Sequence, residues 1–335
     1  MVFFNVFLKT LGFLLGLATF LIFINLLIYF FSNYEDKFKF IKGERSSNNI
    51  IASLELNGPI FTNINQSLLG NVIEYINPEN VKSYLHSLQN INPKILIIKI
   101  NSPGGTVSAT ASLEKIINDF KKDNKTEVYF FSNEILASGG YWVATSGDKI
   151  FANYGTIIGS IGVTGPSWYY YDYPTSISRG IFGQKIETKN GIKIFNQNAG
   201  NSKDLYNPFR KPTIKELEHL QSIVKKIYND FIIKVSNSRS IELSVLENEI
   251  GALIFNSGQA KENFLIDDVL DYNDLINNII KEKNFKDYKI MELNISSNIF
   301  TNYLSNYIYK NYNFICNKLN NNFVSVMPLF LNECN

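Results

Sequence analysis

The chain has 335 residues, with 32 lysines and arginines against 30 aspartates and glutamates, so its formal net charge is +2. This balance offers no strong charge for binding nucleic acid or another polyanion. Apolar residues make up 45% and charged residues 19%, which argues against disorder. Cys316 and Cys334 cannot form a disulfide framework or a CxxC metal site, and two histidines are too few for a His-rich metal centre. We therefore expect no metal and no cofactor.

The N-terminal region contains a long apolar segment. Residues 10–31 carry no charge and, at about 1.5 Å per residue, can cross the ~30 Å hydrocarbon core of a membrane. No small-residue cleavage site follows, which favours a retained signal anchor over a cleaved signal peptide. We assign residues 1–9 as a short flank, 10–31 as the transmembrane anchor and 32–48 as a juxtamembrane linker. The flanking charges alone favour a cytoplasmic body, but this rule is weak for a long translocated domain.

Strand and helix patterns then alternate along the chain. Strands are predicted at 50–56, 95–100, 128–131 and 149–152, and helices at 77–89, 106–121, 141–145, 213–238 and 243–250. This alternation predicts an α/β fold with a mainly parallel sheet and helices outside it. Further on, a strand at 289–295 and an aromatic amphipathic helix at 299–312 are expected. Such a helix could lie on the membrane, on a neighbouring subunit or on the core.

Three glycine-rich turns carry residues with chemical potential. Ser102-Pro103-Gly104-Gly105 lies between a strand and a helix, where free N–H groups suit a developing oxyanion. In the second turn, Ser138 precedes Gly139 at the head of a short helix, so its hydroxyl can be exposed and the Gly139 N–H can be a second oxyanion donor. A plain N-cap serine is the commoner alternative. In the third, Ser160 lies in an apolar, glycine-containing segment, which alone indicates a strand with bulges.

A nucleophilic serine needs a general base. His86 and His219 lie on amphipathic helices among polar neighbours, so a Ser-His-Asp triad is the weaker option and a Ser-Lys dyad is worth considering. A lysine can act as a base only if burial or a like charge lowers its pKa from about 10.4 to near 7–8. Lys203, in a short polar turn, is the best candidate, although a lone lysine is usually a solvated surface cation.

Five segments follow one another along the chain: NSPGGTV (101–107), ILASGGYWVAT (135–145), DKIFANYGTIIGSIGV (148–163), GIKIFNQNAGNSKDLYNPFR (191–210) and IFNSGQAKENFLID (254–267). Together, and in this order, they resemble the signal peptide peptidase A (SppA) family of membrane-bound serine peptidases. The resemblance covers residues 50–270 and implies a ClpP/crotonase-like ββα spiral. We place this domain at residues 49–285, with a C-terminal extension at 286–335. The length and the single anchor resemble the short form of the family.

The resemblance implies a role for each matching residue. Ser138 matches the nucleophile, Lys203 the general base, and Ser160 the hydroxyl that orients this lysine. The oxyanion donors would be Gly139 together with Gly105 or the adjacent Gly104.

The chain departs from the family in a long, aromatic-rich insert at residues 164–190. Its first aromatic side chains could line a substrate groove or fill a subunit interface; they are Trp168, Tyr169 and Tyr170. The extra length creates three competitors for the role of the base, although the spacing from the preceding glycine motif favours Lys203. These competitors are Lys185, Lys189 and Lys193.

The resemblance implies a serine endopeptidase that degrades remnant signal peptides and other apolar peptides at the membrane, without a cofactor and without nucleic acid. In short-form members it implies a homo-oligomer, an octamer, whose sites take the serine and the lysine from neighbouring subunits. It places the catalytic body on the periplasmic side of a bacterial inner membrane, against the charge count at the anchor.

Three other functions are compatible with parts of this pattern. A crotonase-type acyl-CoA enzyme would share the spiral but does not explain Ser138 and Lys203 together. A related Ser-Lys membrane protease acting on membrane-scaffold proteins would keep the same residues. A non-catalytic oligomeric scaffold would tolerate loss of either residue.

Overall fold

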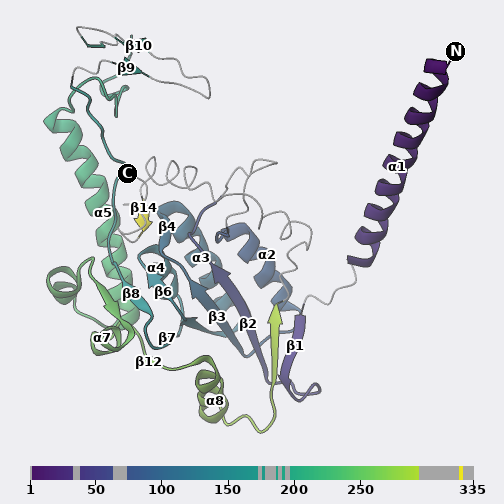
Figure 1. Cartoon of the computed structure of the whole chain (residues 1–335). Helices are drawn as coiled ribbons and strands as arrows, with labels where there is room; N and C mark the ends of the chain where they lie inside the picture. Colours follow the sequence, from purple (N-terminus) through teal and green to yellow (C-terminus); the bar gives the residue numbers. More distant parts are fainter. Residues whose placement is uncertain are drawn as a thin grey trace.

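The computed structural model describes residues 2–32, 38–62, 74–172, 176–177, 186–187, 191–192, 197–293 and 324–326. Helix α1 (Val2–Ser32) is apolar along its length and stands apart from the α/β body (Figure 1). Within it, residues 4–27 form a helix long and apolar enough to cross a membrane, and none of the most apolar window is buried. The predicted anchor at 10–31 therefore lies on one continuous helix, whose residues 4–27 are apolar enough to cross a membrane.

The central sheet confirms the predicted α/β architecture. Its seven strands among the described residues run in the order β1-β13-β2-β3-β5-β7-β12. All neighbouring pairs are parallel except β1 with β13. The strands are β1 (Phe38–Gly43), β2 (Ile50–Asn57), β3 (Ile95–Asn101), β5 (Glu127–Ser132), β7 (Lys149–Ala152), β12 (Asp268–Val269) and β13 (Lys289–Leu293).

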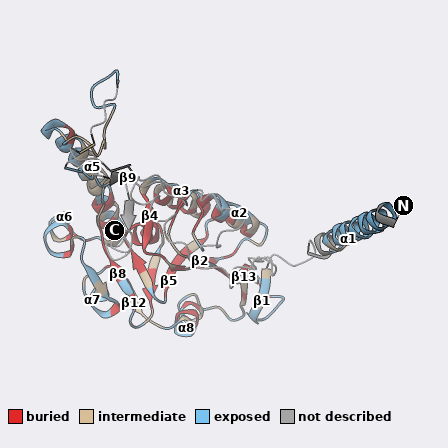
Figure 2. Cartoon of the chain, turned by 45° about the horizontal axis from the view of Figure 1, so that its top comes forward, coloured by how far each residue is buried: buried red, intermediate tan, exposed pale blue. Residues whose placement is uncertain are grey.

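Helices cover both faces of this sheet, and the buried core lies between the layers (Figure 2). On one face lie α2 (Pro78–Gln89), α3 (Val107–Asn124), α4 (Gly139–Ala144) and α5 (Ile214–Arg239), and on the other lies α8 (Tyr272–Glu282). Because successive side chains of a strand point to opposite faces of the sheet, Leu96 of β3 packs in the core under α2–α5 and Ile97 packs in the core under α8. Helix α2 begins as predicted, with Asn77 Oδ1 accepting the Glu79 N–H at 2.9 Å.

Shorter elements complete the body. A second sheet has the order β11-β8-β6, from β11 (Ile254–Asn256), β8 (Ile157–Gly159) and β6 (Ile135–Ala137). Strand β4 (Gly104–Thr106) pairs with β14 (Val324–Val326), and β9 (Ser176–Ile177) with β10 (Ile186–Glu187). The helix predicted at 243–250 is α6 (Leu243–Val245) continued by the π-helical turn η1 (Leu246–Ile250), and α7 (Ser257–Glu262) follows.

The sheet extends past the predicted domain limits of 49 and 285. Strand β1 lies in the segment expected to be a linker, and β13 lies in the segment expected to be an extension. In β1, Phe38 and Phe40 are partly buried and Lys39 between them is exposed. The strand can therefore turn one side toward the core although the predicted linker around it is polar. The helix expected at 299–312, Cys316 and Cys334 lie outside the described residues.

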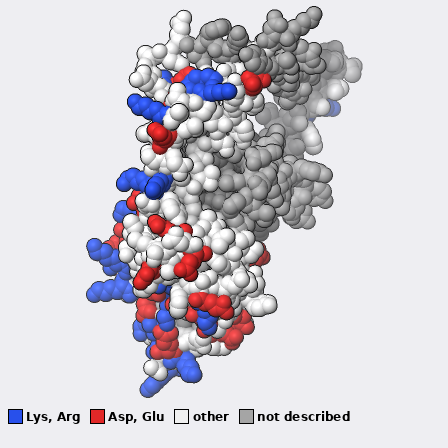
Figure 3. Space-filling view, turned by 90° about the vertical axis from the view of Figure 1, so that its left-hand side faces the viewer, with Lys and Arg blue, Asp and Glu red and all other residues white. Residues whose placement is uncertain are grey.

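The surface charge agrees with the near-neutral composition. On the side of the body viewed in Figure 3, acidic and basic side chains are interspersed and form no broad patch of one sign.

Candidate active site

Ser138 occupies a sharp turn between β6 and α4. Its backbone has φ 53° and ψ −120°, a conformation that favours glycine. Its N–H donates to the Gly159 carbonyl at 2.8 Å, and its own carbonyl accepts the Trp142 N–H at 2.9 Å. The residue is 1% exposed, and its side chain makes no capping hydrogen bond to α4. The ordinary N-cap role therefore does not explain this serine, whereas a strained strand-turn-helix position is typical of a nucleophile.

The first glycine turn lies beside Ser138. Ser102 donates its N–H to the Ile135 carbonyl at 2.8 Å and accepts the Ala137 N–H at 3.1 Å, which joins the end of β3 to β6. Gly104 follows with φ +106° and donates its N–H to Ser102 Oγ at 3.2 Å. A Cβ atom on Gly105 would lie 2.0 Å from the Ile60 carbonyl oxygen, so only glycine fits there.

Ser160 lies in the third turn, next to Ser138. Strands β6 and β8 are parallel with Ala137 opposite Gly159, so the residues that follow them, Ser138 and Ser160, are neighbours at the same edge. Ser160 has φ 51°, is 2% exposed and donates its N–H to the Leu253 carbonyl at 2.7 Å. It lines a hollow of about 330 Å³ that Tyr228 and Lys225 of α5 also line. The structure thus brings all three predicted glycine turns together.

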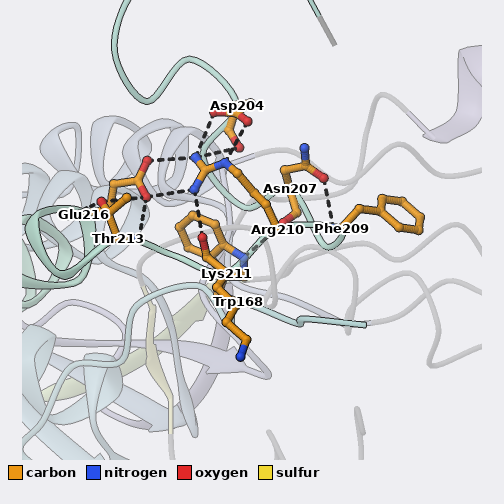
Figure 4. Close-up of polar contacts among 8 residues, drawn as sticks. All are labelled: Trp168, Asp204, Asn207, Phe209, Arg210, Lys211, Thr213 and Glu216. Carbon is orange, nitrogen blue, oxygen red and sulfur yellow. Dashed lines mark hydrogen bonds and ion pairs between the residues drawn. The ribbon is translucent and has the colours of Figure 1, made fainter. Parts of the chain in front are cut away.

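Lys203 is not part of this cluster within one chain. It is exposed and lies in a turn before α5, where its N–H donates to the Gly200 carbonyl at 3.3 Å. The adjacent Asp204 is tied through Arg210 to Glu216, in the first turn of α5 (Figure 4). The opposite half of α5 is the part that packs on α4, since Phe231 stacks on Trp142. The rise from residue 216 to residue 231 is about 22 Å.

The other candidate bases are placed as follows. His86 and His219 are exposed on α2 and α5, as expected of solvated helix residues. The three competing lysines, Lys185, Lys189 and Lys193, lie outside the described residues. Within the described ranges, no group of three or more His, Cys, Asp or Glu residues is arranged to hold a metal ion.

The aromatic insert contacts the segment that follows Lys203. Trp168 donates its Nε1–H to the Asn207 carbonyl at 3.2 Å and lies 5.3 Å from the Tyr206 ring, centroid to centroid. Lys211 Nζ lies 5.5 Å from the centroid of the Tyr170 ring. Trp168 therefore packs against residues 206–207 of its own chain, a contact that the sequence alone does not indicate. The suggested groove role of Tyr169 and Tyr170, which are exposed, stays a prediction.

Sequence reasoning missed the ion-pair cluster around Arg210. The guanidinium binds Asp204 and Glu216, and Glu216 also belongs to a capping box with Thr213. Hydrogen bonding to this guanidinium is the main reason that the pKa of each carboxyl group is lowered. The two carboxylates in turn raise the pKa of Arg210. A Thr-x-x-Glu pattern at 213–216 is a readable capping signal, but nothing in it indicates the arginine partner.

Fold and site together define a class of protein. A buried serine with positive φ, flanked by two glycine turns on an α/β body, is typical of a serine peptidase. Residues 120–286 match the family model described as peptidase family S49, whose fold is ClpP/crotonase-like. The chain belongs to this family and is an SppA-type serine peptidase.

Individual relatives agree with this assignment. The chain is 28% identical over 250 residues to a putative signal peptide peptidase SppA of Enterococcus faecium, covering 74% of this chain and 68% of the relative. It is 27% identical over 252 residues to a putative protease of Methanocaldococcus jannaschii, covering 74% and 75%. It is 26% identical over 188 residues to protease 4 of Haemophilus influenzae, covering 55% and 28%.

Proposed function

We propose that this chain is a membrane-anchored endopeptidase that cleaves apolar peptides, remnant signal peptides among them, with Ser138 as the nucleophile and Lys203 as the general base. The observation that carries the proposal is the turn at Ser138, which is strained, almost fully buried and adjacent to Gly104–Gly105 and Ser160. Such strain is retained where the backbone must present a reacting group. The apolar helix α1 keeps the site near a membrane, where apolar peptides partition.

The proposed reaction is acyl transfer. The neutral amine of Lys203 takes the proton from Ser138 Oγ, and Oγ attacks the peptide carbonyl carbon. The N–H groups of Gly139 and of Gly105 or Gly104 stabilise the oxyanion. The amine then protonates the leaving nitrogen as the C–N bond breaks. Water, deprotonated by the same amine, hydrolyses the acyl-enzyme and regenerates the serine.

The lysine is proposed to come from a neighbouring copy. Within one chain the turn at Lys203 is tied to the first turn of α5, whereas α4, which follows Ser138, packs on Phe231 in the other half of α5, and Lys203 is exposed. The hollow lined by Ser160, the neighbour of Ser138, is where we propose that the incoming side chain enters. Leaving water for this hollow would favour the uncharged form of an amine, as a general base requires. A closed ring, an octamer in our proposal, repeats this contact at every subunit.

The proposed location is a bacterial inner membrane, with α1 as a single span and the body on the periplasmic side. The resemblance to the family implies this orientation, and we give less weight to the opposing charges beside α1 because long domains translocate largely regardless of charge. A C-terminal reporter that is active only outside the cytoplasm is expected. Activity only in the cytoplasm would reverse the assignment.

The decisive experiment measures hydrolysis of an apolar fluorogenic peptide by the full-length chain in detergent. Ser138→Ala and Lys203→Ala are expected to lose at least ~10³-fold in kcat. Lys211→Ala and Lys225→Ala are the matched controls, because Lys211 is exposed near the same turn and Lys225 lines the hollow at Ser160. If Lys203→Ala keeps full activity and Lys225→Ala loses it, the general base is Lys225 and not Lys203. Equal activity in all variants would refute the dyad.

A further inference from the structure

The guanidinium of Arg210 lies between two carboxylates, and it uses its fixed planar geometry on both (Figure 4). Its Nε and Nη2 donate to Asp204 at 2.7 and 2.8 Å. Its Nη2 and Nη1 donate to Glu216 at 2.8 and 2.9 Å. A lysine cannot reproduce two such two-point contacts, because its ammonium is a single point charge.

Glu216 fixes one end of this bridge to a rigid element. It is 6% exposed, and its Oε2 also accepts the Thr213 N–H at 2.9 Å and the Thr213 hydroxyl at 3.0 Å. Its position is therefore set by the first turn of α5, a helix of 26 residues. A carboxylate this buried needs a cation to compensate its lost hydration, and Arg210 supplies it.

The aromatic insert completes the enclosure. The Arg210 guanidinium carbon lies 5.2 Å from the centroid of the Trp168 ring, within the range of a cation–π contact. Trp168 is itself held by its hydrogen bond to the Asn207 carbonyl. Trp168 thus contacts the guanidinium in addition to the two carboxylates.

The other end of the bridge is Asp204, the residue next to Lys203. We infer that Arg210 is a positioning residue for the reaction: by joining Asp204 to α5 it holds the exposed turn so that Lys203 projects in one fixed direction. The inference rests on the proposed role of Lys203 as the general base. A base that must enter a site from outside its own core needs such a holder, because a displacement of about 1 Å can cost ~10²-fold in rate.

The test compares Arg210→Lys with a matched control in the full-length chain in detergent. The control is Arg239→Lys, at the opposite end of α5, where Arg239 binds Asp267 at 2.8 Å and the Phe264 carbonyl at 2.9 Å. We expect Arg210→Lys to lower kcat ~10²-fold and to change KM by no more than about twofold. Arg239→Lys should shift Tm by a comparable amount but keep the wild-type kcat. Equal kcat in both variants at equal oligomer size would overturn the inference.

Two further measurements separate positioning from folding. Added guanidinium ion should restore part of the kcat of Arg210→Gly, because it can bridge the same carboxylates. In a Lys203→Ala background, Arg210→Lys should cause no further loss, since both changes act through one group. An additional ~10²-fold loss in that background would refute the inference. If Lys203→Ala is as active as the wild type, the proposed function fails; if Lys203→Ala is inactive but Arg210→Lys is not, only this inference fails.

Discussion

The indole ring of Trp142 stacks on the ring of Phe231, with centroids 4.8 Å apart and 26° between the ring planes. Trp142 lies one turn after Ser138, and its Nε1–H donates to Glu114, which also binds Lys234 of α5. These contacts fix α4 against the C-terminal half of α5. The turn that carries Lys203 is tied to the opposite end of α5, which supports the proposal that the nucleophile and the base come from neighbouring copies.

Shared sites predict complementation between two inactive chains. In Ser138→Ala the lysine is intact, and in Lys203→Ala the serine is intact. Co-expressed in equal amounts and mixed randomly in one ring, they should restore about one quarter of the wild-type sites. Peptide hydrolysis by the purified mixed oligomer measures this. Mixed oligomers that stay inactive would show that each site is built from a single chain.

Backbone strain at Ser138 predicts that activity and stability can be separated. The observed φ of 53° and ψ of −120° suit glycine and cost other residues about 1–3 kcal/mol. Ser138→Gly should therefore be inactive but have a higher Tm than Ser138→Ala, which keeps the strain. Thermal unfolding of both variants checks this. A lower Tm for the glycine variant would mean that the conformation is unstrained in this context.

The position of β1 predicts where a soluble fragment can begin. Phe38 packs against the main core, and β1 covers the outer edge of β13. A chain starting at residue 34 keeps this strand, whereas one starting at residue 48 loses it and leaves β13 as a bare edge. The shorter fragment should be less stable by on the order of 2 kcal/mol and should aggregate. Denaturant unfolding and light scattering make the comparison, and equal stability would count against the assignment of β1 to the sheet.

The regular helices and strands of this fold could be predicted from the sequence, because their local signals agree with the burial that the fold requires. Asn77 and Pro78 mark the start of α2, and the apolar run at 95–100 can only be buried. The register of β6 and β8, which makes Ser138 and Ser160 neighbours, is a long-range property that no local signal encodes. The tie between Arg210 and Asp204 likewise depends on where the start of α5 lies in space.

Acid should weaken the cluster around Arg210. Its guanidinium lowers the pKa of Glu216 from an ordinary 4.5 and that of Asp204 from an ordinary 3.8. A lowered pKa contributes stability that is present above the unfolded value and is lost as the pH falls through the folded value. The Tm difference between wild type and Arg210→Gln should therefore be constant from pH 7 to 5 and shrink below about 4.5. A difference that grows on acidification would contradict this electrostatic account.

The pairing of β14 with β4 predicts that β14 competes with the peptide substrate for the edge of β4. Ser325 lies opposite Gly105 and Val326 opposite Gly104 in an antiparallel ladder, so β14 occupies the edge that carries two of the proposed oxyanion donors. An extended peptide that added to β4 would need the same backbone groups. Ser325→Pro leaves position 325 without a backbone N–H and with a fixed φ, so it should weaken this pairing. The variant should lower KM for an apolar peptide several-fold with little change in kcat, because an internal competitor raises the apparent KM alone. Steady-state kinetics of the full-length variant give both constants, and an unchanged KM would show that β14 and the substrate use separate surfaces.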